Sequence, residues 1–297
     1  MIDPSLMADL LRQDVIHTQI YQCIVPLRYL CLPLPDRERL DKLVSHLEQR
    51  RNTDIFRLVE HNIANFLRNR LKLTQFDAEN IQRICGILDT NCFDIRFRGR
   101  VSTRGLYPTA SLMNHECVAN TRHVFDPDDW RIRILATKEI QTGERISATY
   151  TQSLWNTLDR RWQLKSNKHF WCCCRRCSDP RELGTFLSSL KCPECGGMLL
   201  SEDPLNQSAN WICTECQTTH NFKKVSKIHE GVRSELKQTA QLAPSCPELL
   251  EGFIGKYSGA VHPDSCHVME AKYAIVQLYG NTQEFFYHGF YKIISYC

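Results

Sequence analysis

The sequence has no apolar run of about 18 residues, the length that a membrane-spanning helix needs. Its beginning, Met1-Ile-Asp-Pro-Ser, lacks the basic and apolar regions of a secretory signal. Internal repeats and low-complexity tracts are also missing, and the net charge is only +4, so no overall basic field favours nucleic acid. These absences predict an intracellular protein, cytoplasmic or nuclear, with no membrane partner.

Cysteine, in contrast, is abundant, with 16 in a chain of 297 residues. In a reducing compartment, clustered cysteines indicate metal ligands and not disulfides. The rest of the composition is ordinary for a globular protein, with 42% hydrophobic and 24% charged residues, and the length allows two or three domains.

The first ninety residues are predicted to be helical. Apolar residues over 55–71 recur at steps of three and four, which puts them on one helix face. Thr53 or Asp54 is expected to cap that helix. A second helix is expected over about 77–88. Prolines predict a turn region before the first helices: Pro26, Pro33 and Pro35.

Between residues 91 and 150 the pattern changes to short alternating segments, of which 130–135 and 145–150 each predict a strand. Helical patterns return at 154–168, 225–236 and 268–278. We therefore expect an α+β protein with small sheets in the middle and helices at both ends.

Four cysteines form two pairs that are separated by 17 residues: Cys192, Cys195, Cys213 and Cys216. This spacing is typical of a zinc site in which two knuckles supply four thiolates. Gly196 and Gly197 permit the tight backbone of the first knuckle. A redox dithiol is the alternative, but two pairs at this spacing do not favour it. Because four protein ligands leave no open position, the zinc is predicted to be structural.

A denser run lies just upstream, where Cys172, Cys174 and Cys177 provide three further ligands. Cys173 is left out, because adjacent side chains in an extended segment point in opposite directions. The fourth ligand must come from elsewhere. A local basic stretch precedes and overlaps the run, and it predicts either a solvated helix face or a wall for an acidic substrate or partner: Arg160, Arg161, Lys165, Lys168, Arg175 and Arg176.

The segment 114–120, Asn-His-Glu-Cys-Val-Ala-Asn, resembles the Asn-His-Ser-Cys-x-Pro-Asn motif of SET-domain protein lysine methyltransferases. Residues 143–150 are similar to the SET strand that carries a tyrosine, and 170–177 to the post-SET cysteine motif. Gly-Leu-Tyr-Pro at 105–108 and the helical tail at 261–280 point to the SET-and-MYND (SMYD) branch, especially its insect members. The resemblance covers roughly residues 21–280.

The resemblance implies roles for individual residues. Cys117 would join Cys172, Cys174 and Cys177 around one zinc, which gives two structural zinc ions in all. Asn114 and His115 would hold S-adenosylmethionine, with Phe170 against its adenine, and Tyr150 would be the catalytic residue beside the methyl group. Ordinary packing roles are the alternatives: a core tyrosine, a core histidine, a turn-capping asparagine and a phenylalanine packed on the zinc knuckle.

With this resemblance we expect five parts along the chain. They are a helical SET insert (1–90), the C-terminal part of the SET core (91–152), a post-SET zinc region (153–185), a four-cysteine zinc module (186–220) and an incomplete C-terminal helical domain (221–297).

The sequence departs from the family pattern in several places. Glu116 replaces the motif serine and Ala119 the motif proline. SET domains open with a Gly-x-Gly strand that cradles the cofactor, whereas the first glycine here is Gly86, and the MYND zinc finger is absent. We therefore expect an N-terminally truncated form that begins inside the SET domain.

The resemblance implies an S-adenosylmethionine-dependent protein-lysine N-methyltransferase that acts on a histone or another protein in gene regulation. The missing glycine strand favours an alternative, a catalytically impaired SET-like scaffold that binds partners such as corepressor proteins. A nucleic-acid-binding zinc protein has the least support, because no aromatic and basic platform accompanies the cysteine pairs.

Overall fold

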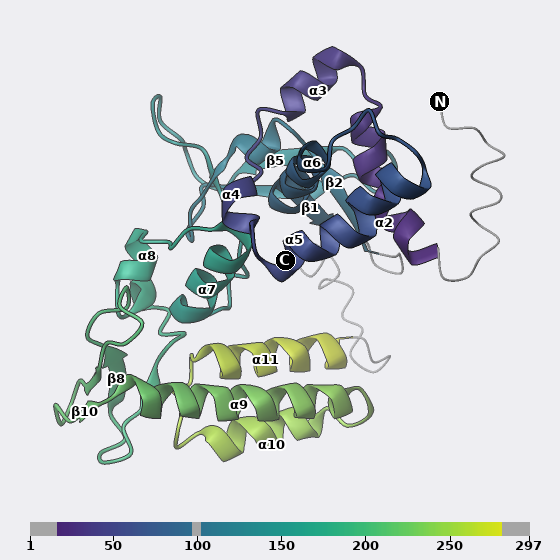
Figure 1. Cartoon of the computed structure of the whole chain (residues 1–297). Coiled ribbons are helices and arrows are strands. Elements are labelled where there is room, and N and C mark those ends of the chain that lie inside the picture. Colours follow the sequence, from purple (N-terminus) through teal and green to yellow (C-terminus); the bar gives the residue numbers. More distant parts are fainter. Residues whose placement is uncertain (1–16, 97–101, 281–297) are drawn as a thin grey trace. The chain divides into compact units, whose positions relative to one another are not determined.

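The computed structural model describes residues 17–96 and 102–280 (Figure 1). They divide into two compact units. The first unit comprises the described residues up to 114, together with 123–135 and 167–169, and the second comprises 115–122, 136–166 and 170–280. Residues 281–297 of the expected C-terminal helical domain lie outside the described residues.

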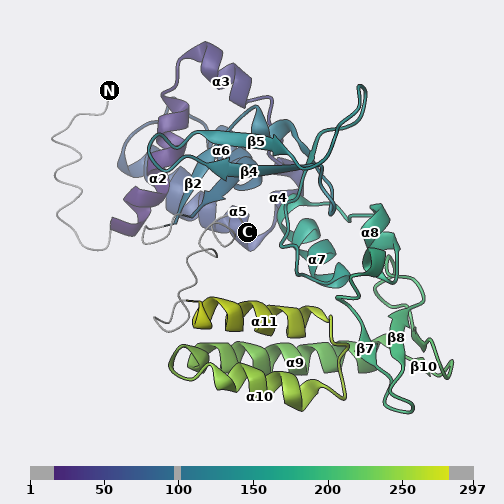
Figure 2. The same ribbon diagram turned by 180° about the vertical axis from the view of Figure 1, so that it is seen from behind.

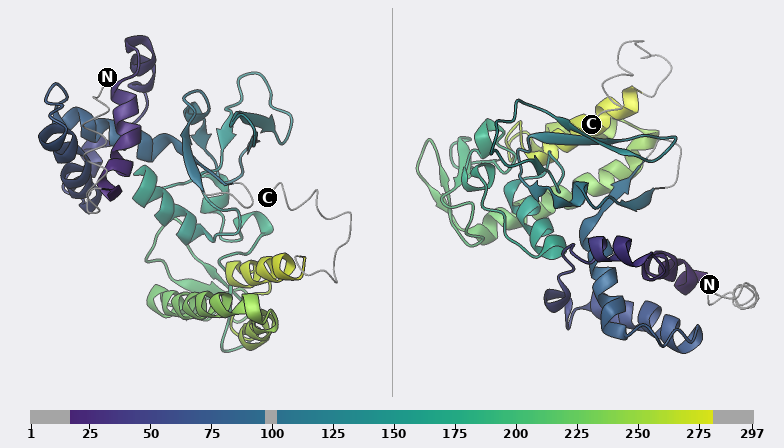
Figure 3. Two further views of the ribbon diagram at one scale, coloured as in Figure 1. Left: turned by 90° about the vertical axis from the view of Figure 1, so that its right-hand side faces the viewer. Right: turned by 90° about the horizontal axis from the view of Figure 1, so that it is seen from above.

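The first unit is built mainly of helices, which Figure 3 shows as one group in purple and blue. They are α2 (His17–Leu30), α3 (Leu34–Leu40), α4 (Leu47–Arg50), α5 (Asp54–Val59), the π-helical segments η1 (Glu60–Ala64) and η2 (Phe66–Arg70), and α6 (Ala78–Asn91). Their core is fully buried at Leu67, Ile81, Ile84 and Ile87. The predicted helical beginning is thus confirmed for its described part.

Local signals explain where two of these helices begin. The hydroxyl of Thr53 accepts a hydrogen bond from the Phe56 N–H at 3.2 Å. Thr53, one of the two residues predicted for this position, therefore caps α5. The carboxylate of Asp77 accepts from the Asn80 N–H at 2.6 Å and caps α6.

The prediction of one apolar face over 55–71 was wrong at its start. Ile55 and Leu58 are 52% and 59% exposed, whereas Phe66 and Leu67 are buried. The cause is the pair of π-helical segments after α5, which hold more residues per turn than an α-helix. Residues before and after them therefore do not share a face at α-helical spacing.

The predicted turn region is correct at Pro33, which precedes α3, and wrong at Pro26, which lies inside α2. The first unit also holds β1 (Cys92–Ile95) and β2 (Thr103–Leu106), an antiparallel pair in which Cys92 lies opposite Leu106.

A second hairpin joins β4 (Thr121–Phe125) to β5 (Ile132–Ala136), seen from behind in Figure 2. The strand predicted at 130–135 begins only at Ile132, because Trp130 adopts a left-handed φ of 62° in the connecting turn. The Trp130 N–H donates to the Asp126 carbonyl at 3.0 Å, which closes that turn.

Two two-residue strands pair with each other. These are β3 (Asn114–His115), which follows the short helix η3 (Ala110–Leu112), and β6 (Ser147–Ala148). The strand predicted at 145–150 is thus much shorter than expected. The buried Asn120 side chain provides the reason, because it bonds the Arg145 carbonyl (2.9 Å) and the Ser147 N–H (2.8 Å) in place of a partner strand.

The second unit continues with α7 (Thr157–Lys168), of which the last two residues are counted with the first unit, α8 (Arg175–Ser178) and the turn η4 (Glu182–Gly184). A four-stranded antiparallel sheet follows, in the order β10-β9-β8-β7, from β7 (Leu190–Lys191), β8 (Met198–Ser201), β9 (Trp211–Cys213) and β10 (Thr219–His220).

The unit ends in helices, among them α9 (Phe222–Leu242), η5 (Ala243–Ser245), α10 (Glu248–Tyr257) and α11 (Cys266–Tyr279), which pack around a shared core. The predicted face of α9 is confirmed, with Val225, Val232 and Leu236 buried and Ile228 packed against them. Over the described ranges, no helix is both long and apolar enough to cross a membrane.

Both interpretations of the basic stretch at 160–176 were wrong for its three most buried members. Arg160, Arg161 and Arg176 are 1%, 5% and 7% exposed. Arg161, for example, donates to the carbonyls of Cys172 (2.9 Å) and Leu205 (2.7 Å). These guanidinium groups hold the fold together internally, so they present neither a solvated face nor a wall to a substrate.

Candidate functional site

The first cysteine site brings together two segments that are far apart in the sequence. The Sγ atom of Cys117 lies 3.9 Å from that of Cys172 and 3.5 Å from that of Cys177, although 55 residues separate Cys117 from Cys172. Cys174 completes the group, in which all four sulfurs lie within 4.8 Å of one another. Cys173 is exposed and is not part of the group, as predicted.

The second cysteine site joins the two predicted pairs. Cys192 and Cys216 are 3.7 Å apart at Sγ, and Cys195 and Cys213 are 3.5 Å apart. Gly196 takes a φ of 76°, and the N–H of Gly197 points at the Cys195 sulfur at 3.4 Å, so both glycines serve the knuckle as expected.

Both groups have the dimensions of a zinc site. A tetrahedral zinc with Zn–S bonds of about 2.3 Å requires sulfurs about 3.8 Å apart, close to the separations found here. Each group supplies four sulfurs and no other donor type, which is the ligand set of a closed, structural zinc. The residues present therefore fit the metal in number, type and spacing.

His115 connects the first cysteine site to Tyr150. Its Nδ1 accepts a hydrogen bond from the backbone N–H of Tyr150 at 3.1 Å, and its Nε2 lies 3.2 Å from the Cys117 sulfur. Burial lowers the pKa of His115 to about 4, so the ring is neutral near pH 7. With Nδ1 accepting, the single proton lies on Nε2 and is donated to the sulfur.

Two further aromatic rings lie beside His115. The ring centroids of Tyr150 and Phe170 are 5.2 Å and 6.0 Å from that of His115. Tyr150 is 37% exposed and Phe170 36%, so neither is enclosed in a core. Burial of the phenol raises the pKa of Tyr150, which keeps its hydroxyl protonated. The three rings form a partly open aromatic surface next to the cysteine site.

Comparison with known proteins identifies the domain that carries His115 and Tyr150. Residues 13–151 match the family model of the SET domain. The chain is a SET-domain protein related to the SMYD family.

Among its SMYD relatives, the Drosophila melanogaster protein SmydA-8, isoform A, is 30% identical over 224 residues, which are 73% of this chain and 47% of that protein. The Arabidopsis thaliana histone-lysine N-methyltransferase ASHR1 is 27% identical over 70% of the chain and 43% of its own length. Human SMYD3, a histone-lysine N-methyltransferase, is 38% identical over 25% of the chain and 17% of its own length. The chain thus spans less than half the length of these relatives.

The SET motif at 114–120 contains a residue whose role the sequence reasoning missed. Asn120 is 3% exposed, and besides Arg145 and Ser147 its amide reaches the Glu144 carboxylate at 3.3 Å. It fixes the segment that leads into Tyr150. Its place in the motif was the signal that could have revealed it. Asn114, the other motif asparagine, is exposed at the start of β3.

The second cysteine site has outer contacts that the sequence reasoning also missed. The Nε2 atom of His220 lies 3.0 Å from a Glu194 carboxylate oxygen and 4.0 Å from the Cys192 sulfur. His220 is 5% exposed. The interval of three residues between Cys216 and this histidine was the available signal, and the group supports a ligand of the knuckle from outside.

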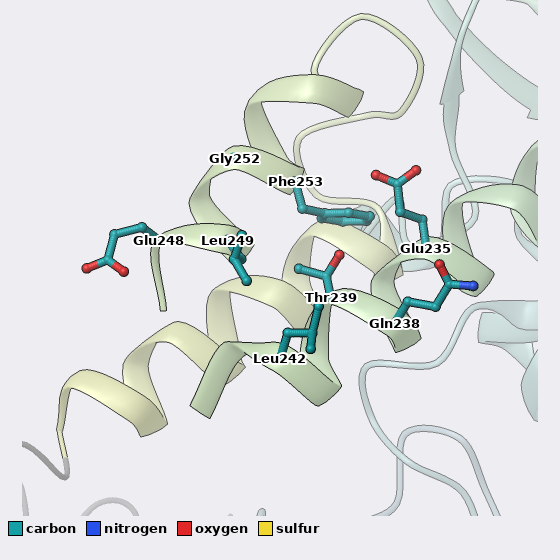
Figure 4. Close-up of a pocket in the computed structure, with 8 residues that line it drawn as sticks. All are labelled: Glu235, Gln238, Thr239, Leu242, Glu248, Leu249, Gly252 and Phe253. Atoms are coloured by element: carbon teal, nitrogen blue, oxygen red, sulfur yellow. The ribbon is translucent and has the colours of Figure 1, made fainter. Parts of the chain in front are cut away.

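A cavity of about 510 Å³ lies between α9 and α10 of the second unit (Figure 4). Leu242, Leu249 and Phe253 form its apolar part, and the carboxylates of Glu235 and Glu248 stand at its rim. None of the predicted site residues lines this cavity.

Proposed function

We propose that the chain is an S-adenosylmethionine-dependent protein-lysine N-methyltransferase. The observation that carries the proposal is the grouping of Tyr150, His115 and Phe170 beside the first cysteine site. Tyr150 and His115 lie in the segment that matches the SET domain. Several relatives are named as histone-lysine N-methyltransferases or as an N-lysine methyltransferase, which supports a protein lysine, in a histone or another protein, as the substrate.

The exposed ring surface fits a cofactor with a purine. Phe170 would pack against the adenine, because a third of its side chain is open and aromatic faces stack favourably. Both ring nitrogens of His115 have partners within the protein, so a contact from His115 or Asn114 to the cofactor would come from the main chain or from the exposed Asn114 amide.

When bound, S-adenosylmethionine would supply an electrophilic methyl group on a sulfonium. The protein must present a neutral lysine amine, whose ordinary pKa is about 10.4. Burial next to a cation lowers that pKa. The Tyr150 hydroxyl would orient the amine, while His115 holds the Tyr150 backbone in place.

The two cysteine sites would each hold one structural zinc. The chain would be organised in the five parts expected from the sequence, from the helical SET insert at 1–90 to the C-terminal helical domain at 221–297. The first zinc would fix Cys117 and, through His115, Tyr150. In this arrangement the metal shapes the site and takes no part in methyl transfer.

Isothermal titration of the zinc-loaded chain with S-adenosylmethionine is the first test. Micromolar binding, followed by transfer of a labelled methyl group to a histone or peptide lysine, is the expected result. A folded chain with two zinc ions that binds no cofactor would contradict the proposal.

A SET-like scaffold for partner proteins, such as corepressors, is the second candidate. Engagement of both His115 nitrogens inside the protein favours it. If the chain is such a scaffold, it should retain both zinc ions but bind no cofactor in the titration above.

A further inference from the structure

Behind the first cysteine site lies a fully buried ion pair. Arg160 and Glu182 are each 1% exposed, and an Nη1 of Arg160 lies 3.1 Å from a Glu182 carboxylate oxygen. The other end of the same guanidinium points at the site, with Nη2 3.7 Å from the Cys177 sulfur. Arg160 is therefore shared between a cysteine of the site and a carboxylate that touches none of the four cysteines.

The pair has the additional hydrogen bonds that a buried ion pair requires to be stable. The hydroxyl of Thr157 donates to the Glu182 carboxylate at 2.7 Å and accepts from Arg160 at 3.0 Å. The second carboxylate oxygen accepts from the Ser188 N–H at 2.7 Å. Arg160 also donates to the Trp155 carbonyl at 2.5 Å. The guanidinium thus has one orientation, fixed from three sides.

The arrangement places a positive charge beside a metal site that would be negatively charged. Four thiolates and one Zn²⁺ carry a net charge of −2, and burying that charge is costly unless a cation is nearby. Arg160 is the buried cation at Cys177, and a charge-assisted N–H···S bond spreads the thiolate charge. Outer groups of this kind normally change metal affinity by 10- to 100-fold.

Glu182 also begins an unusual stretch of backbone. Glu182, Leu183 and Phe186 have left-handed φ angles of 51°, 59° and 53°, and Gly184 has 84°. Side chains of this size rarely adopt such angles, so surrounding contacts must hold them. The Asp179 carboxylate accepts from the Leu183 N–H at 2.8 Å, and the Arg160–Glu182 pair fixes the start of the stretch. The chain then runs directly into β7 and Cys192.

We propose that Arg160 stabilises the first cysteine site from outside the set of four cysteines. Through Glu182, Arg160 also couples metal binding at that site to the left-handed turn at 182–186, which leads into the second cysteine site. The coupling does not depend on methyl transfer. It makes Glu182 a positioning residue for a metal that it does not touch.

Zinc release tests this proposal. Chelator-driven release from the intact chain is followed in the parent and in Glu182→Gln, with Cys117→Ala used to assign which phase belongs to the first site. We expect release from the first site to accelerate about ten-fold or more, while release from the second site and the behaviour of the exposed control Glu202→Gln stay unchanged. Equal release from both sites in parent and variant would overturn the coupling.

Two further variants separate coupling from a merely structural role. Thr157→Val keeps the side-chain shape and removes the hydroxyl that both Arg160 and Glu182 use, and it should accelerate the same phase even if Glu182→Gln folds poorly. The apolar pair Arg160→Met with Glu182→Leu should recover thermal stability but still release the first zinc quickly, because Cys177 lacks its donor. Recovery of both stability and slow release would overturn the proposal.

Discussion

The backbone N–H of Tyr150 donates to Nδ1 of His115 over 3.1 Å, and the two rings lie 5.2 Å apart. Because the Nε2 of the same histidine faces Cys117, the position of Tyr150 depends on a cysteine of the first site through one imidazole. The hydroxyl of Tyr150 takes no part in this contact, so the phenol can be altered without disturbing the link.

Tyr150→Phe should therefore leave the free energy of unfolding nearly unchanged and abolish methyl transfer. The ring and the backbone contact to His115 remain, while loss of one positioned hydrogen-bonding group typically costs about 100-fold or more in rate. Labelled methyl transfer and denaturant unfolding measure the two effects. Tyr273→Phe, at a tyrosine of similar exposure (40%) on α11, is the matched control. Equal turnover in the Tyr150 variant and the parent would rule out the catalytic role.

Cys117→Ala should reduce the zinc content from two ions to one per chain. The variant removes one of four sulfurs that lie within 4.8 Å of one another, and three ligands hold zinc much more weakly than four. Metal analysis after dialysis measures the change. Cys173→Ala, in the same cysteine run but exposed and outside both sites, should keep two ions. Two zinc ions in the Cys117 variant would disprove the shared site.

Acid should destabilise the protein through a buried pair of histidines in the second unit. Nδ1 of His229 lies 3.0 Å from Nε2 of His267, and both side chains are buried. Burial, with Arg233 nearby, lowers the pKa of His229 to about 4. Burial, with His229 and Arg233, lowers that of His267 to about 3. Only the unfolded chain binds these protons readily, so stability is complete above pH 6.5 and declines as the pH falls towards 4.

The linkage amounts to about 2 kcal/mol for each histidine at pH 5. Denaturant unfolding at pH 7.5 and pH 5 measures it. Because zinc thiolates also titrate in acid, the comparison is with His229→Gln/His267→Gln, whose amides cannot take up a proton and which should lose less stability on acidification. An identical pH dependence in both proteins would assign the acid sensitivity elsewhere.

Two glycines should respond in opposite ways to substitution by alanine. A Cβ at Gly86 in α6 would lie 2.3 Å from the Ser45 carbonyl oxygen, whereas one at Gly231 in α9 meets nothing within 4 Å. Gly86→Ala should therefore destabilise the chain by about 2 kcal/mol or more, and Gly231→Ala should stabilise it by up to about 1 kcal/mol, since alanine is the better helix former. Denaturant unfolding of the pair checks both signs.

The sequence alone predicted those features that depend on residues close to one another in the chain. The grouping of the four cysteines in the second site follows from spacing alone, and the helical face of α9 follows from periodicity. Cys117 could be assigned only through the motif, because no local rule joins residues 55 positions apart. The burial of Arg160 was missed because arginine is usually exposed, and only tertiary contacts reveal its partner Glu182. The π-helical segments after α5 were missed because their residues do not repeat at the α-helical period.

The 55 positions from Cys117 to Cys172 also bear on how readily each cysteine site could close around a metal. Cys192 and Cys216 of the second site are only 24 positions apart, and closing a shorter loop costs less chain entropy. If both groups bind zinc, as proposed above, a full-length chain that refolds in limiting zinc would fill its second site first. In the singly loaded form, Cys117 and, through His115, the backbone of Tyr150 would lack the support of the first metal.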